Sequence, residues 1–230
     1  MWNRKELKEK AKIAFKANYW KTVLVSFILV IVGGGAGYVT FSNNSASTND
    51  VTTQVNGFSQ GELLAILLAV LGGIALIGTV MFVVKLLLLN PLSVGCQKFF
   101  KENAEFPADL NEIGAGFREK YGNVVLTIFL QNLFLALWTM LFIIPGIVKS
   151  YSYRMVPFIL ADNPEMSSTD IITKSREMMN GHKWDAFVLD LSFLGWLILS
   201  GMTAGILAVF YVDPYIFQTN AELYLALKGE

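Results

Sequence analysis

The sequence predicts an all-α integral membrane protein that occupies residues 1–230 as a single membrane domain. Hydrophobic residues make up 54% of the chain and charged residues 16%, whereas soluble domains average about 45–50% and about 25%. The stretches 22–41, 63–84, 122–148 and 191–212 contain no Asp, Glu, Lys or Arg, and each has the roughly 18 residues needed to cross a bilayer. We therefore expect about six transmembrane segments in three hairpins, each preceded by an inner-leaflet amphipathic helix.

The distribution of Lys and Arg predicts the side of the membrane on which each loop lies. Residues 1–21 contain seven basic residues, and the loop 42–61 contains none. Because basic loops stay in the cytoplasm, we expect the N-terminus inside and the loop 42–61 outside. Basic residues also gather in 90–121 and 162–183, so the chain is expected to return to the inner side each time and to end there.

The predicted spans follow from this alternation. They are 22–41, 62–89, 122–144, 145–161, 184–210 and 211–227. Two of them are open to doubt as full crossings, because 145–161 contains Lys149 and Arg154, and 211–227 is interrupted by Asp213, Asn220 and Glu222. A cleaved signal peptide at the N-terminus is the alternative to the first span. It is disfavoured because the charged region is too long for a normal n-region, and the apolar run exceeds the usual 7–15 residues.

Amphipathic helices are expected ahead of the hairpins, within 1–21, 101–121 and 167–183. In the first, Asn3 and Glu6 fit a helix start, and apolar residues then recur at helical spacing. We expect the apolar stripe in lipid and the lysines near anionic headgroups. Aromatic side chains at these entrances are expected to anchor the protein at the interface. The predicted anchors are Trp2, Tyr19, Trp20, Tyr121 and Trp184.

The second segment of each predicted hairpin contains, or is directly followed by, a proline beside or near a polar or charged residue. The three prolines are Pro91, Pro157 and Pro214. Together with the similar entrances, they predict three degenerate units, each an interfacial helix followed by a membrane hairpin. The alternative is that every inner-leaflet entrance attracts Lys and Trp by itself.

Charge within a membrane segment is costly, so it marks a candidate functional site. Arg154 lies near the middle of its segment, and Asp190 and Asp213 are its candidate partners. The full candidate intramembrane polar site is Lys149, Arg154, Asp190, Asp213 and Asn132. The alternative, which we favour, is that these charges snorkel to the interface or form one orienting ion pair.

Small residues at four-residue spacing predict close helix packing. The candidates are Gly33, Gly37, Gly201, Gly205, Ala69 and Gly73. Packing within the monomer is favoured over dimerisation, because this spacing is a weak motif in a glycine-rich membrane protein.

Catalysis and metal binding have little support in the sequence. Cys96 is the only cysteine and His182 the only histidine, which excludes an intramolecular disulfide and a Cys/His zinc site. The phosphate-loop, nucleophile-elbow and metalloprotease motifs are also missing. We therefore expect no catalytic residue, metal or cofactor. Because the net charge is zero, a nucleic-acid partner is not expected either.

Three stretches carry a resemblance to a known family. They are MWNRKELKEKAK, IPGIVKSYSYRMVPFILADNP and SREMMNGHKWDAFVLDLSFLGWLIL. They resemble uncharacterised multi-pass membrane proteins of Gram-positive bacteria, classed as a domain of unknown function. The middle stretch is distantly similar to the membrane region that precedes the catalytic barrel of some glycerophosphodiester phosphodiesterases. The resemblance implies a six-helix membrane domain; it supplies no catalytic residues, because that barrel is missing here.

Two functions are left open by the sequence, and an intramembrane enzyme is a third, disfavoured alternative. The first is a non-enzymatic multi-pass protein of a bacterial plasma membrane that engages anionic lipid on the inner leaflet, a membrane-protein partner or a second copy of itself. The second is a small transporter or lipid-translocating protein with a polar site around Arg154.

Overall fold

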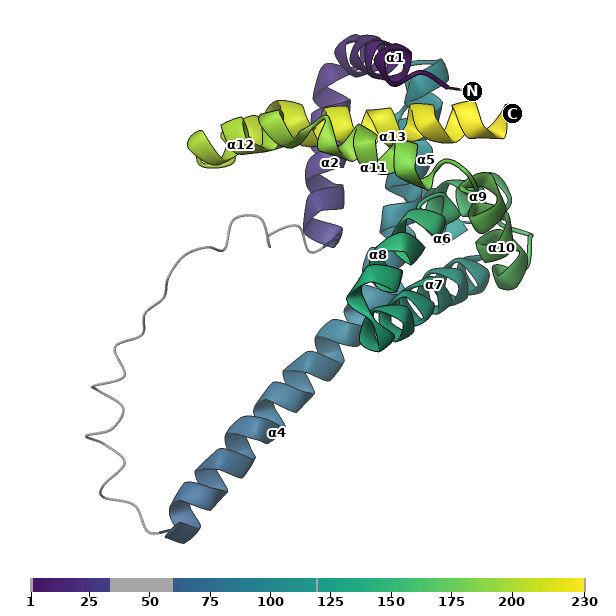
Figure 1. The fold of residues 1–230 in the computed structure, drawn as a ribbon. Helices are drawn as coiled ribbons and strands as arrows, with labels where there is room; N and C mark the ends of the chain where they lie inside the picture. The colour runs from purple at the N-terminus through teal and green to yellow at the C-terminus, as the bar shows by residue number, and fades with distance from the viewer. Residues whose placement is uncertain (1, 34–59, 119, 230) are drawn as a thin grey trace.

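The computed structural model describes residues 2–33, 60–118 and 120–229, and these ranges contain helices and no strand (Figure 1). The α-helices are α1 (Arg4–Ala17), α2 (Tyr19–Val32), α4 (Gln60–Val84), α5 (Asn90–Glu105), α6 (Ala115–Arg118), α7 (Tyr121–Leu141), α8 (Ile143–Ser152), α9 (Val156–Asp162), α10 (Ser168–Met178), α11 (Lys183–Leu191), α12 (Leu194–Met202) and α13 (Asp213–Lys228). The π-helices η2 (Lys85–Leu89) and η4 (Ala208–Val212) and the 3₁₀-helix η3 (Leu110–Gly114) complete the set. The predicted outer loop falls almost wholly outside the described residues.

Among the described residues, three helical stretches are long and apolar enough to cross a membrane: Gly61–Glu105, Tyr121–Leu141 and Lys183–Met202. A fourth arises if α1 and α2 are counted together, although they are bent by 107° at Asn18. In the ranges that the structure describes, the chain is therefore all-helical, with three to four candidate spans. The predicted segment 145–161 is divided between α8 and α9, and 211–227 between η4 and α13, so neither contains one helix of that length.

Helix α1 begins where the sequence predicts. The Asn3 side chain accepts a hydrogen bond from the backbone N–H of Lys5 at 2.9 Å, which satisfies one of the free donors of the first turn. The apolar stripe of α1 differs from the prediction. Leu7, Ala11 and Phe15 are buried, and α1 packs on α13 and α5, so protein rather than lipid covers the stripe.

The predicted helix within 101–121 is also different in the structure. Helix α5 ends at Glu105, and a non-helical stretch follows up to Asp109. Pro107 disfavours a helical conformation in the residue before it, and the Asp109 side chain accepts from the Leu110 N–H to start η3. The elements η3 and α6 then fold back onto α5.

Two of the close contacts within this region occur at glycines. A Cβ atom at Gly95 would collide with the Ile113 carbonyl, and one at Gly116 would collide with the Pro91 carbonyl. A third close contact lies between α7 and α8, where Gly146 faces Thr139. None of these glycines belongs to the predicted packing set, because that set rests on four-residue spacing within one segment and these contacts join separate elements.

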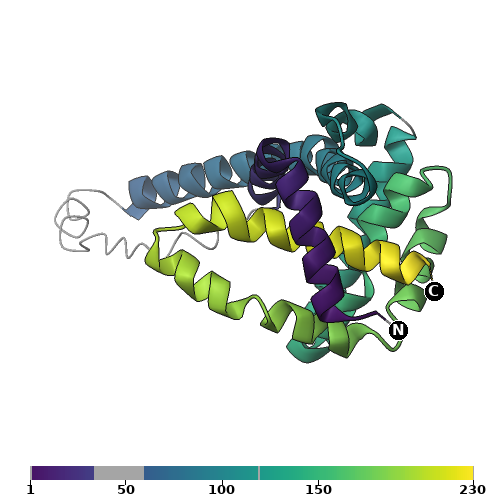
Figure 2. The same cartoon turned by 90° about the horizontal axis from the view of Figure 1, so that it is seen from above.

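The core lies around α5, α9 and α13, each of which has a proline in its first turn. Buried residues from α1, α2, α5, α7, α9, α10, α11 and α13 form one cluster, in which the rings of Phe158 and Tyr224 stack at 5.2 Å. By contrast, α4 has no buried residue in its most apolar window and projects from the rest of the molecule (Figure 1). Figure 2 shows α1 crossing over α13.

Candidate functional site

Arg154 lies at a break between two short helices. Helix α8 ends at Ser152 and α9 begins at Val156, with a turn between them. Pro157 in the first turn of α9 has no N–H to donate to a preceding turn, so it begins a new helix here and does not continue α8. The break directs the arginine side chain at α11 and α13, where its hydrogen-bond partners lie.

The guanidinium of Arg154 forms a two-pronged ion pair with Asp190. Its Nη1 donates to one carboxylate oxygen at 2.9 Å and its Nη2 to the other at 2.7 Å. Nη2 also donates to the side-chain oxygen of Asn220 at 2.6 Å, and the Tyr151 hydroxyl donates to Asp190 at 3.0 Å. The Arg154 side chain is 16% exposed and that of Asp190 37% exposed. The arrangement therefore joins the α8–α9 break to α11 and α13 at once.

The other members of the predicted polar site lie elsewhere. The Lys149 ammonium lies over the Trp138 ring, 4.6 Å from its centroid. Asp213 is in the first turn of α13, and Asn132 is exposed on α7. None of these has a hydrogen bond to Arg154 or Asp190 among the described contacts. The sequence pointed to Asn220 only as an interruption in an apolar segment, and its pairing with Arg154 had no local signal.

A second polar cluster, which the sequence did not indicate, lies at the C-terminal end of α9. The Asp162 carboxylate accepts hydrogen bonds from Lys101 at 2.5 Å, from Lys228 at 2.6 Å and from the Tyr224 hydroxyl at 2.7 Å. Burial alone raises the pKa of Asp162, but these three hydrogen bonds outweigh it and hold the pKa below its ordinary value. The cluster connects the C-terminal ends of α5, α9 and α13.

A third cluster consists of buried amide side chains. The Asn103 side chain donates to Gln218 at 2.9 Å and accepts from Asn18 at 2.9 Å. Gln218 donates in turn to the Phe100 carbonyl at 3.1 Å, and Gln218 is fully buried. Since Asn18 is the residue at the bend between α1 and α2, this network fixes the bend against α5 and α13.

Lysines form a stripe along one side of α1. Lys5, Lys8, Lys12 and Lys16 are separated by three, four and four residues, the spacing that places side chains on one helix face. Lys8 lies in the middle of the stripe, donates to the Ser192 side chain at 3.0 Å and lies over the Phe193 ring at 4.0 Å; burial lowers its pKa. The other three are exposed. Ile13 and Trp20 nearby are 70% and 73% exposed.

The predicted packing residues make few contacts within the described chain. No atom lies within 4 Å of a Cβ built at Gly73 or Gly201, and α4, which contains Ala69, is exposed. Gly33 ends α2, and Gly205, with φ of +82°, forms a turn after α12. The pair at 201 and 205 therefore does not share one helix. Gly37 lies outside the described residues.

The predicted anchors occupy different environments. Trp20 and Trp184 are 73% and 71% exposed. The Tyr19 hydroxyl donates to the Phe210 carbonyl at 3.1 Å, and the Tyr121 hydroxyl donates to the Leu87 carbonyl at 2.7 Å. Trp2 packs near His182, with ring centroids 6.4 Å apart. Two anchors thus also connect helices, which composition alone did not predict.

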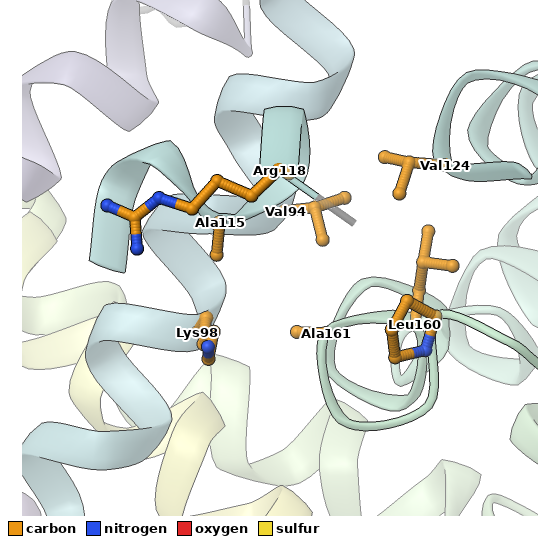
Figure 3. Close-up of a pocket in the computed structure, with 9 residues that line it drawn as sticks. Val94, Lys98, Ala115, Arg118, Val124, Leu160 and Ala161 are labelled. Carbon is orange, nitrogen blue, oxygen red and sulfur yellow. The ribbon is translucent and has the colours of Figure 1, made fainter. Parts of the chain in front are cut away.

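A small pocket lies between α5, α6, α7 and α9 (Figure 3). It has a volume of about 40 Å³ and is lined partly by Val94, Lys98 and Arg118, which is room for little more than water. Figure 3 shows the Arg118 guanidinium extending away from Val124 and Leu160. Among the described residues, no group of three His, Cys, Asp or Glu side chains is placed to hold a metal ion.

Comparison with protein families gives a match in the second half of the chain. Residues 118–230 match the family described as "Protein of unknown function (DUF975)". The match begins just before α7 and includes Arg154, Asp190 and Asn220. It is consistent with the resemblance to an uncharacterised family. No curated protein and no solved structure matches the chain.

Proposed function

We propose that this chain is a non-enzymatic, multi-pass protein of a bacterial plasma membrane, and that the lysine stripe of α1 engages anionic lipid headgroups on the inner leaflet. In this placement both termini and the basic loops lie on the cytoplasmic side, in agreement with the distribution of Lys and Arg.

The bend between α1 and α2 carries this proposal. The two helices meet at 107°, so α1 lies along the membrane surface if α2 follows the membrane normal. Asn18, Asn103 and Gln218 hold this bend with buried hydrogen bonds. A helix held along the surface keeps its lysines at headgroup depth, where each is worth about 1 kcal/mol of attraction to an anionic leaflet.

The burial of the apolar stripe of α1 determines how this helix would interact with lipid. Leu7, Ala11 and Phe15 are covered by protein, so α1 is not free to insert its own stripe into lipid. The exposed Lys5, Lys12 and Lys16 then act mainly as charges, and Trp20 adds an amphipathic side chain beside them. We expect a salt-sensitive interaction with headgroups.

The alternative of a transporter with a polar site around Arg154 has less support. The donors of Arg154 are directed at Asp190 and Asn220, and Asp213 and Asn132 lie apart from it. A paired arginine of this kind favours a role in holding helices together. A ligand at this position would have to displace hydrogen bonds that the protein already makes.

The test is the effect of lipid on the thermal stability of the detergent-solubilised protein. We expect phosphatidylglycerol to raise the melting temperature more than phosphatidylcholine, and high salt to reduce the difference. Replacing Lys5, Lys12 and Lys16 together by glutamine should remove at least half of the phosphatidylglycerol effect.

The matched control replaces the same three lysines by arginine, which keeps the charge. That variant should respond to phosphatidylglycerol as the wild type does. If the glutamine variant keeps the full response, the lysine stripe is not the headgroup site, and the proposal is wrong.

A further inference from the structure

The third hairpin, formed by α11, α12, η4 and α13, presents an apolar tip without protein cover. Ser200 is the only buried residue of α12. Ile198, Met202 and Ile206 are 63%, 80% and 64% exposed, and no Asp, Glu, Lys or Arg occurs in 191–212. Apolar surface of this extent requires a nonpolar environment, and lipid acyl chains supply one.

Length alone permits the hairpin to cross the bilayer. The stretch Lys183–Met202 has 20 residues, which corresponds to about 30 Å of helix and matches the hydrocarbon thickness. The direction of the hairpin decides between crossing and lying flat. In Figure 1, α12 and α13 run from side to side, whereas α2 runs from top to bottom. Figure 2, turned by 90° about the horizontal axis, again shows both legs along their length. The hairpin is thus crosswise to α2.

Contacts at the base of the hairpin fix this direction. Arg154 binds Asp190 on α11 and Asn220 on α13, so it connects both legs to the α8–α9 break. Lys8 of α1 donates to Ser192 between α11 and α12 at 3.0 Å. The hairpin is therefore held to helices on two sides and is not free to pivot into line with α2.

One contact also sets the depth of the hairpin. The hydroxyl of Tyr19, the first residue of α2, donates to the Phe210 carbonyl on the return leg at 3.1 Å. The return leg therefore passes α2 at the level where α2 enters the membrane. This level is the inner boundary of the hydrocarbon layer, where tyrosine is common.

We infer that the third hairpin lies flat within the cytoplasmic leaflet and does not cross the membrane, with the acyl chains of that leaflet as its binding partner. This inference rests on the proposed membrane placement of α2. It replaces the last two predicted spans, 184–210 and 211–227, by one in-plane element, and it leaves the C-terminus in the cytoplasm.

The test measures depth along the hairpin in the full-length protein reconstituted in phosphatidylglycerol and phosphatidylcholine vesicles. Single cysteines replace Leu194, Ile198 and Met202 in turn and carry a nitroxide, whose collision rates with oxygen and with a water-soluble nickel chelate report depth. Cys96 is fully buried, so the native chain supplies the unlabelled background. All three sites are exposed, and a cysteine there removes no core contact.

A flat hairpin gives the three sites the same depth within the inner leaflet, with oxygen favoured over nickel at each. A crossing hairpin instead changes depth by about 1.5 Å per residue, or about 12 Å from Leu194 to Met202, and this gradient would overturn the inference. Equal access of nickel and oxygen at all three sites would also overturn it, since the hairpin would then lie in water.

The control series uses Leu67, Ile74 and Met81 on α4. These sites are exposed and lie on one long apolar helix, so they should show a depth gradient. A gradient on α4 with equal depths on α12 supports the inference. Equal depths on α4 as well would show that α4 does not cross, which contradicts the proposed membrane placement and not only the flat hairpin.

Discussion

Helices α4 and α13 both belong to second segments of predicted hairpins, but their surroundings are opposite. α4 has no buried residue in its most apolar window, whereas α13 buries Gln218, Thr219 and Tyr224 among others. α4 consists almost entirely of apolar and small residues, while the polar side chains of α13 bond to α5 and α9. The buried polar residues of α13 thus mark protein contacts, because lipid offers no hydrogen-bond partner.

The largest loss of stability is expected when a side chain is added at a position between packed helices that has no room for it. Gly95→Ala places a Cβ against the Ile113 carbonyl, and we expect a loss of about 3 kcal/mol in the free energy of unfolding in mixed micelles. The matched control on the bare helix is Gly73→Ala, which meets nothing within 4 Å and should change stability by less than about 0.5 kcal/mol. Equal effects would contradict the contrast between packed and bare helices.

The next largest loss of stability is expected at the ion pair between Arg154 and Asp190, at the base of the third hairpin. Arg154→Gln leaves the Asp190 carboxylate without its main partner, and we expect a loss of about 2–3 kcal/mol, moderated because Asp190 is 37% exposed. Asp190→Asn should destabilise similarly, and the double variant should recover part of the loss. Additive losses in the double variant would show that the two side chains do not act as a pair.

A smaller effect is expected within the amide cluster. Gln218→Leu leaves the Asn103 amide and the Phe100 carbonyl without a partner, which should cost about 2 kcal/mol. Thr79→Val on α4 is the control, since the Thr79 hydroxyl bonds only to the Ala75 carbonyl of its own helix at 2.8 Å. A neutral Gln218→Leu would mean that this network does not hold the α1–α2 bend.

The smallest expected effect is a dependence of the unfolding free energy on pH, through the carboxyl group of Asp162. The pKa of Asp162 is lowered in the folded protein, so its stabilisation is complete above its ordinary pKa and is lost as the pH falls through the lowered value. Between about pH 5 and about pH 3, the wild type should lose more unfolding free energy than Asp162→Asn. Parallel curves for the two proteins would show that Asp162 is not stabilised by Lys101, Lys228 and Tyr224.

Local signals in the sequence predicted the parts of the fold that depend on neighbouring residues. The Asn3 start of α1 is confirmed, and so is the helical character of the apolar stretches within the described residues. The apolar stripe of α1 does not reveal whether lipid or protein covers it, because a helical apolar period is the same in both cases. Only the packing of α1 on α5 and α13, which lie far along the chain, separates the two cases.

The candidate polar site was predictable only in part. Arg154 and Asp190 stand out because charge is rare in apolar segments, and the structure brings these two together. Asp213, Lys149 and Asn132 have the same local signal and lie elsewhere, because the break before Pro157 determines where Arg154 is directed. The three-unit repeat stays a prediction. Its three prolines do each lie at the start of a helix, in α5, α9 and α13.

The contact between α1 and α13 has a consequence for synthesis. The Tyr215 hydroxyl bonds to the Lys8 carbonyl across 207 residues of chain. At about 5–20 residues per second, a ribosome needs roughly 10–40 s to make the chain between them. During that interval Leu7, Ala11 and Phe15 have no α13 to cover them, and the inner leaflet is the nearest apolar surface. The nascent α1 is therefore expected to rest on lipid first and to exchange lipid for protein only when the last helix emerges.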